Sequence, residues 1–241
     1  MRYFLLACLL TIATCISSCG DRVKKGEGSV TTVTPKVSSF NAVQVELPLK
    51  VTINVQKGAQ PSVKLSGYAS FLIHIKAKVE NNMLYLSSDL DDRMAMDSKT
   101  VTAEVTTSQL NEVYLSSTAD ADIHGNITSK IFKAEVTGKS NITIDDVNTD
   151  NFSYNASGGA SLAMGGGTAK IASFSIDDNC IIKAFPFQVK ESNVTVKGNG
   201  KCELSATKKL NTNIAATGDV KYKGHPDILK NPEGGTINDA N

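Results

Sequence analysis

The chain has 241 residues, of which 41% are hydrophobic, 20% are charged and 6% are aromatic, with no tryptophan. This length suits one domain of moderate size with a sizeable hydrophobic core. Lys and Arg number 25 against 24 Asp and Glu, which leaves a formal charge of +1. A general nucleic-acid-binding surface is therefore not expected.

The N-terminus has the pattern of a bacterial export signal. A short positive start precedes an apolar run from Tyr3 to Ile16, which is too short to span a bilayer. Small residues then lead into Cys19. This segment resembles the lipobox of bacterial lipoproteins, in which the cysteine is acylated and becomes the mature N-terminus. We expect a lipoprotein signal peptide over residues 1–18 and lipidation of Cys19, with an ordinary cleavage site beside a cysteine as the alternative.

The segment after this cysteine predicts a tether. Residues 20–37 contain Gly, Ser, Thr and charged residues with little apolar content, which is typical of a flexible linker. We expect residues 19–37 to hold the folded part at a membrane through the acyl chains. This would place the protein in the bacterial cell envelope, on the outer membrane, with the periplasmic or the surface face left open.

Residues 38–109 predict short β-strands outside any regular repeat. Apolar residues alternate with mainly polar ones from Val43 to Val55, and Pro48 inside this run predicts a bend or an edge. A second alternating run extends from Phe71 to Val79, and shorter runs follow at residues 84–86 and 101–105. We expect these strands to form a less regular N-terminal β cap, because an uncapped end would expose strand edges.

The second half contains an internal repeat. Rows of twenty residues begin at residues 131, 151, 171, 191 and 211 and align without gaps, and an earlier row at 113–125 fits with one residue of slippage. One apolar column contains Ile142, Leu162, Ile182, Cys202 and Tyr222, and the turn column contains Gly138, Gly158, Asp178, Gly198 and Gly218. Glycine suits a turn that requires a positive φ, and Asp tolerates that region better than most residues.

The repeat predicts the fold class. A single row offers four to six inward side chains worth about 1.5–3 kcal/mol each, which cannot offset the ordering entropy of its residues, so the rows must stack. We expect an all-β protein, a right-handed parallel β-helix or β-solenoid with coils of about 20 residues over residues 110–230. Residues 231–241 are expected to form a C-terminal tail.

Four segments resemble a known bacterial family: Phe40 with the alternating run after it, Asn-Asn-Met-Leu-Tyr-Leu at 81–86, Gly138 to Ile142, and Ala-Thr-Gly-Asp-Val-Lys-Tyr-Lys-Gly-His-Pro at 216–226. The chain is similar over residues 38 to about 230 to the family called putative auto-transporter adhesin, head GIN domain. The resemblance implies a β-helical fold and an adhesin-like role without an established ligand or reaction. The glycine turns of this chain are degenerate copies of those of the family.

The sequence shows no catalytic constellation. Its histidines are far apart and lack the spacing that places two ligands on one metal ion: His74, His124 and His225. Paired aspartates occur in different columns, so they cannot share Ca²⁺ between coils. No arginine follows Arg93, which disfavours a polysaccharide-active enzyme built on the repeats. We predict no catalytic residue, no metal site and no cofactor.

Two cysteines would remain in the exported domain. Cys180 and Cys202 occupy the tenth and twelfth positions of adjacent rows, so both are expected to face inward. Two residues along the strand and one coil across place them roughly 7–8 Å apart, beyond the usual reach of a disulfide. We expect two buried free thiols.

The rows also predict polar ladders on the outer surface. Ser153 and Ser173, and then Asn193 and Asn213, fall in the third column of successive rows. Such a ladder suits a repetitive partner, either a glycan or a protein of the envelope or cell surface. The leading hypothesis is thus a non-enzymatic, lipid-anchored adhesin or glycan-binding protein. An envelope scaffold, in which the polar groups only keep the coils soluble, is the alternative.

Overall fold

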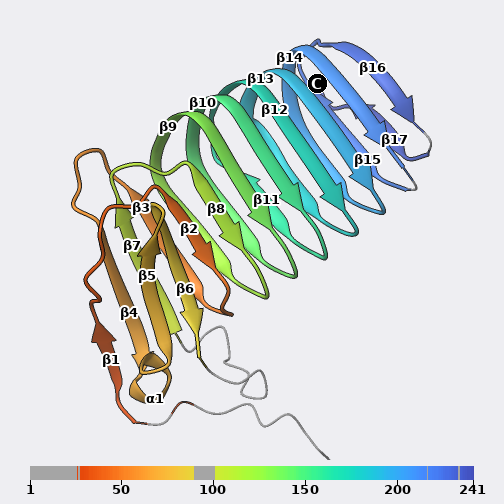
Figure 1. The fold of residues 1–241 in the computed structure, drawn as a ribbon. Coiled ribbons are helices and arrows are strands. Elements are labelled where there is room, and N and C mark those ends of the chain that lie inside the picture. The colour runs from red at the N-terminus through yellow and green to blue at the C-terminus, as the bar shows by residue number, and fades with distance from the viewer. Residues whose placement is uncertain (1–25, 27, 90–100, 216, 233) are drawn as a thin grey trace, which may run out of the picture.

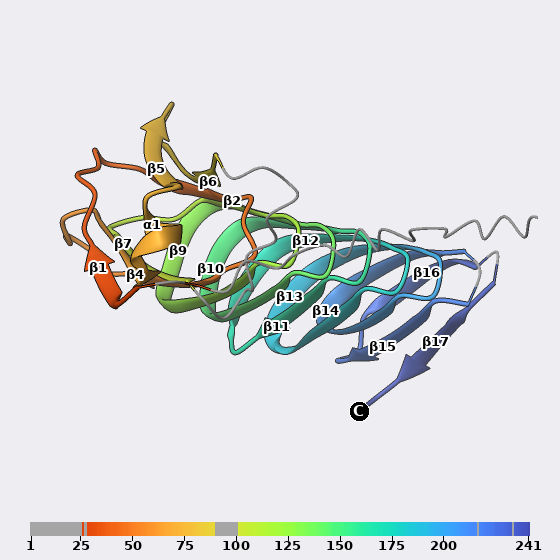
Figure 2. The same cartoon turned by 90° about the horizontal axis from the view of Figure 1, so that it is seen from below.

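The computed structural model describes residues 26, 28–89, 101–215, 217–232 and 234–241. Within these residues the chain forms seventeen strands of one continuous sheet and a single helix of four residues. The strands wind into an elongated β-solenoid, shown in two views in Figure 1 and Figure 2. Successive coils pair in parallel, with Asn141 opposite Ser161 and Ser161 opposite Ile181, so the predicted β-solenoid is confirmed.

The N-terminal part forms a cap at one end of the solenoid (Figure 1). Its elements are β1 (Val30–Val33), β2 (Ala42–Val45), β3 (Lys50–Val55), β4 (Ser62–Tyr68), α1 (Ala69–Leu72), β5 (Ile75–Glu80), β6 (Met83–Ser88) and β7 (Val101–Thr107). The alternating run is divided into β2 and β3 around Pro48, as predicted, because proline cannot donate to a strand ladder.

Spatial order and chain order differ in the cap. β2 lies between β6 and β8, and β3 lies between β7 and β9, with all four pairings parallel. Two strands from early in the sequence, β2 and β3, are thus flanked on both sides by strands that come later. Antiparallel pairing then closes the end, with β5 on β6, β4 on β7 and β1 on β4.

The repeat part consists of long strands that bend at the corners of each coil. They are β8 (Glu112–Leu115), β9 (Asp120–Val136), β10 (Asn141–Ala156), β11 (Ser161–Met164), β12 (Gly167–Asp177), β13 (Ile181–Lys197), β14 (Lys201–Ile214), β15 (Asp219–Lys223), β16 (Asp227–Pro232) and β17 (Thr236–Asp239). Between β9 and β10 the register shifts by one residue after Ile144, which confirms the slippage expected of the earlier row.

The core lies inside the coils and stacks in register. Ile142, Leu162 and Ile182 are fully buried neighbours in adjacent coils. Phe132 and Phe152 also pair, with ring centroids 5.9 Å apart and an interplanar angle of 20°. Each coil therefore covers the apolar side chains of the next, which is how rows too small to fold alone gain stability by stacking.

The cap differs from its prediction in one segment. The alternating run from Phe71 predicts a strand, but residues 69–72 form α1 and the strand starts at Ile75. Phe71 and Leu72 are adjacent and both buried, whereas Ile73 is 76% exposed. Two buried neighbours fit a helical turn and not a strand, in which neighbouring side chains point to opposite faces.

The ends of the domain are also more ordered than expected. Residues 30–33, placed in the flexible tether, form β1 and pair with β4. Residues 236–239, placed in the C-terminal tail, form β17 and pair with β15. Both segments are largely exposed and lack a run of alternating apolar residues, so the apolar pattern could not reveal strands that add to a sheet through backbone hydrogen bonds.

The repeat shortens by two residues after β13. Ala184 pairs with Leu204, as the gapless rows predicted, but Glu191 pairs with Lys209 where the rows placed Asn211. Residues 185–187 have no partner in β14, which removes three residues from the coil, and Lys190 lies opposite residues 207 and 208, which restores one. The shorter coil persists in the next pair of strands, where Cys202 lies opposite Val220. The gapless alignment of the last row is therefore wrong: Val220 occupies the column assigned to Tyr222, and Tyr222 pairs with Leu204.

The alternating pattern could not show this change. A shift of one residue moves every side chain of a strand to the other face, but a shift of two residues returns each side chain to its original face. The longer and the shorter coil therefore give equally apolar columns. The same shift places Gly218 beside Gly200 and not in the turn column to which it was assigned.

Candidate functional site

The candidate site is one outer side of the solenoid, here called the ladder face. It is the outward side of strand segments 112–115, 133–136, 153–156, 173–177, 193–197 and 211–214. Neighbouring segments pair in parallel, so equivalent outward side chains recur at the strand spacing of about 4.8 Å. These residues lie on β8, β9, β10, β12, β13 and β14 (Figure 1).

The structure brings together three of the four residues predicted to face a ligand. Ser153 pairs with Ser173, and Ser173 pairs with Asn193, in one continuous column. The fourth member of this column is Asn211, whose Nδ2 donates to Asn193 Oδ1 at 2.8 Å. Asn213 instead lies beside Thr195, so its predicted place next to Asn193 is wrong. The shortened coil is the reason.

Ser153 and Ser173 differ from the polar side chains of other outward columns because, in the described part of the chain, their hydroxyls form no hydrogen bond. By contrast, Asn141 accepts from Ser161 at 2.5 Å and donates to Asp120 at 2.7 Å. Asp120, Asn141 and Ser161 thus form a second ladder, whose hydrogen bonds run between coils and stabilise the stack. The hydroxyls of Ser153 and Ser173 remain available to a partner.

The N-terminal end of the ladder face carries an aromatic and charged cluster that the sequence did not reveal. The Tyr114 hydroxyl donates to Glu112 Oε2 at 2.5 Å and accepts from Lys133 Nζ at 3.3 Å. Lys133 Nζ also lies 4.9 Å from the centre of the Tyr114 ring and 3.3 Å from Glu135 Oε2. The strand register joins these residues, which come from β8 and β9.

This environment raises the pKa of both central groups, Tyr114 and Lys133. Burial, followed by the hydrogen bond to Glu112, raises the pKa of Tyr114. Burial disfavours the charge of Lys133, but hydrogen bonds to Tyr114 and Glu135 outweigh it and raise the lysine pKa. At neutral pH the phenol therefore keeps its proton and the ammonium its charge, so the cluster offers fixed donors and an aromatic ring.

Two shallow grooves adjoin this cluster. Each has a volume of about 180 Å³, and Glu135 and Thr137 line both. The first is further lined by Gln44, Val45, Glu46, Tyr114, Leu115 and Ser116, and the second by Asn155, Ala156, Ser157, Ser175 and Asp177. The two grooves share two lining residues and are therefore neighbours. Together they are called the polar trough, which crosses several coils beside the serine column.

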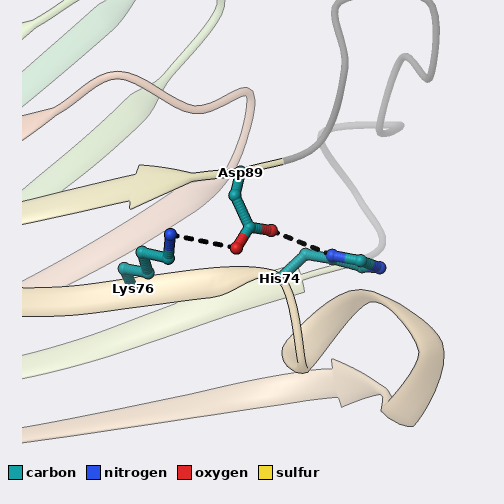
Figure 3. Close-up of polar contacts among 3 residues, drawn as sticks. All are labelled: His74, Lys76 and Asp89. Carbon is teal, nitrogen blue, oxygen red and sulfur yellow. Dashed lines mark hydrogen bonds and ion pairs between the residues drawn. The ribbon is translucent and has the colours of Figure 1, made fainter.

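A second polar cluster lies in the cap (Figure 3). Asp89 accepts from Lys76 Nζ at 3.0 Å and contacts His74 Nδ1 at 2.9 Å. Hydrogen bonds from Lys76 and then from His74 lower the pKa of Asp89. His124 Nδ1 lies 3.1 Å from Asp145 Oδ2 of the adjacent coil, on β10. These are exposed pairs on separate elements and do not converge on a pocket.

Other predicted residues are placed as follows. Cys19 lies outside the described residues. Cys180 and Cys202 are buried free thiols, and burial raises the pKa of both. Across the described ranges, no three His, Cys, Asp or Glu side chains come together as metal ligands would. None of the helical structure described is long or apolar enough to cross a bilayer.

Solved structures with the same fold support this architecture. A putative adhesin from Bacteroides fragilis superposes with a TM-score of 0.79 at 20% identity, covering 89% of this chain and 94% of that one. A putative adhesin from Parabacteroides merdae gives 0.71 at 19% identity, covering 90% and 98%. A protein from Parabacteroides distasonis described as a putative lipid binding protein gives 0.70 at 19% identity, covering 90% and 98%.

The solved structures are distant in sequence and show the fold, whereas the comparison with protein families shows the family. A search of the curated proteins gave no match. A family model matches residues 39–226, which include most of the cap and nearly all of the repeat. The predicted family is therefore confirmed: the chain belongs to the family described as putative auto-transporter adhesin, head GIN domain.

Proposed function

We propose that this chain is a lipid-anchored, non-enzymatic protein of the bacterial cell envelope that binds a glycan along its ladder face. The family and several structural neighbours are described as adhesins, which supports a binding role at an envelope or cell surface. The observation that carries the glycan proposal is the serine column beside the polar trough. The lipid anchor depends on the lipobox-like segment that ends at Cys19.

The serine column suits a ligand that repeats along its length. Ser153 and Ser173 hold free hydroxyls one strand spacing apart, about 4.8 Å. A hydroxyl both donates and accepts, so each can meet a sugar hydroxyl in either role. A glycan lying along the solenoid would meet one such group in each of these two adjacent coils.

Tyr114 supplies the apolar part of such a site. Sugar rings have apolar C–H faces that pack against aromatic rings, and Tyr114 is held in place by Glu112 and Lys133. Glu135 and Asp177 place carboxylate acceptors along the same trough. The trough thus combines one ring with several acceptors, and shallow grooves of this kind favour binding over enclosure of a reacting bond.

The test is a screen of immobilised glycans with the purified chain, followed by calorimetry on the best ligand. Ser153→Ala/Ser173→Ala and Tyr114→Ala should each weaken binding at least tenfold. Lys183→Ala, on an exposed position of another side of the coil, is the matched control and should leave binding unchanged.

Three results would overturn the glycan proposal. The first is that the unmodified chain binds no glycan, and the second is that the ladder-face variants bind as well as the parent chain. The third is capture of an envelope protein by the same face without any glycan, which would favour the scaffold role.

The anchor is tested separately. Cys19→Ala should release the protein from the membrane fraction into the soluble fraction, and mass spectrometry of the parent chain should show an acylated N-terminal cysteine. Cys15→Ala is the control, since this cysteine lies inside the apolar run. Membrane retention of Cys19→Ala, with release of Cys15→Ala, would instead identify the other cysteine as the anchor.

A further inference from the structure

One strand segment of the first full coil has an open edge. β9 pairs with β3 through residues 120–125 and with β8 through residues 133–136. Between them, residues 126–129 and 131–132 pair with β10 on one side. Among the residues that the structure describes, no strand lies on the other side of this segment.

The path of the cap explains the opening. β3 ends at Val55, close to the corner of β9, where an added Cβ on Gly125 would be 2.3 Å from Val55 O. The chain then turns away at Gly58, with φ of +79°, and enters β4 instead of continuing beside Asn126. β3 and β8 therefore cover two sides of the coil, and the third side has no covering strand among the described residues.

The open edge presents backbone hydrogen-bonding groups. In a parallel pair, alternate residues direct their N–H and C=O groups to the same neighbour, so about half of these groups in Asn126–Ser129 face away from β10. Strand edges of this kind are templates for another chain in extended conformation.

A groove of about 540 Å³ lies along this edge. Its lining has an apolar part, Val55 and the 1% exposed Leu110, and a polar part formed by Lys57, Ser108, Gln109, Asn126 and Thr128. One strand residue occupies a volume of roughly 160 Å³, from a rise of about 3.3 Å, a strand spacing of about 4.8 Å and a sheet spacing of about 10 Å. The groove therefore has room for about three residues of an added strand, beside the part of the open segment that lines it, Asn126 to Thr128.

We infer that this edge binds an extended, acidic peptide segment of a partner protein by β-augmentation, as an added strand beside Asn126–Ser129. Backbone hydrogen bonds would give affinity, and alternate side chains of the peptide would pack on Val55 and Leu110. Lys57 provides the charge selection, because within the described ranges no carboxylate forms an ion pair with it. This inference concerns a different side of the coil and does not depend on the glycan proposal.

The experiment begins by panning a phage-displayed library of random eight-residue peptides on the purified full chain. Selected peptides are expected to share an acidic residue and alternating β-branched residues. A synthetic copy should bind the parent chain, and backbone N-methylation at alternate positions should weaken it at least tenfold, since a methylated amide cannot donate.

Two variants locate the site. Lys57→Glu should weaken the acidic peptide at least tenfold, and Ser108→Trp should block the groove. Lys183→Glu makes the same charge change on another side of the coil and should not affect binding. Hydrogen exchange should show protection of amides within residues 126–129 when the peptide binds, and circular dichroism should show that each variant is folded.

Several outcomes would overturn the inference. Failure to select any peptide whose binding requires Lys57 is one of them. Protection confined to β16 or β17 would place the peptide at the other end of the solenoid. Full protection of residues 126–129 in the free chain would show that another segment of this chain or a second copy already covers the edge.

Discussion

Backbone conformation at single residues decides where the coils can turn. Gly138, Gly158, Asp178 and Gly198 all have positive φ, as their common column predicted. Asp178 adopts +59° and its Oδ2 accepts from the backbone N–H of Gly158, so the side chain offsets part of the cost of this conformation. A column can therefore tolerate one non-glycine residue when that residue gains a hydrogen bond.

Adjacent glycines allow this requirement to be measured. Gly158 has φ of +87°, and a Cβ there would lie 2.7 Å from Gly138 O, whereas a Cβ on Gly159 would meet nothing closer than 3.8 Å. Gly158→Ala should lower the free energy of unfolding by about 1–3 kcal/mol, while Gly159→Ala should change it by less than about 0.5 kcal/mol. Urea unfolding of both variants checks this, and equal losses would contradict the turn requirement.

The buried thiols make stability depend on alkaline pH. Burial raises the pKa of Cys180 and Cys202 above the ordinary value of 9.0, so the folded chain keeps protons that the unfolded chain releases. The unfolded state then binds fewer protons, and the free energy of unfolding falls as the pH rises above this value. For the fully buried Cys202 the decline should reach up to about 1.4 kcal/mol per pH unit.

This dependence is measured by urea unfolding between pH 8 and 10 in the presence of a reductant. Cys180→Ala/Cys202→Ala should show a flatter profile than the parent chain over this interval. Identical slopes for the two proteins would show that the thiols do not cause the decline.

Individual strands show which features of strand pairing the apolar pattern can predict. β13 was predicted with the correct inward residues, and Ile182 is fully buried while its neighbour Ile181 is 42% exposed. The pattern failed where β13 meets β14, because residues 185–187 are left unpaired and the later coils are two residues shorter. The alternation of apolar residues identifies the face on which each side chain lies, but it cannot identify the number of residues in a coil.

The same two neighbours test the assignment of faces. Ile182→Asp would bury a charge without a partner and should cost about 3–5 kcal/mol. Ile181→Asp points outward beside Lys201 and should be tolerated within about 1 kcal/mol. Thermal unfolding of the two variants provides the comparison, and similar melting temperatures would contradict the inward and outward assignment.

The whole molecule has two unlike ends. Antiparallel strands close the N-terminal end, whereas β16 and β17 lie at the other end (Figure 1). At that end the Asn241 side chain bonds the backbone of Gly224 twice, with both distances 2.9 Å. This amide satisfies one backbone donor and one backbone acceptor of Gly224.

The orientation of the whole domain on the cell is open to a direct measurement. An adhesin-like role leads us to expect that protease added to intact cells degrades the domain, because the ladder face must reach its partner. Lysed cells and a periplasmic marker are the controls. Protection in intact cells, with degradation after lysis, would confine the protein to the periplasm and favour the scaffold role.

The sequence by itself determined the all-β solenoid, its inward columns and most of its turn positions, since repeat stacking makes each of these properties local to one row. It also indicated the family, through segments of the cap and of the repeat that resemble it. Only the tertiary structure decided the contraction of the later coils, the replacement of Asn213 by Asn211 in the ladder and the insertion of β2 and β3 between later strands. Two-residue shifts preserve alternation, and strand order depends on backbone pairing between distant segments, which no local pattern records.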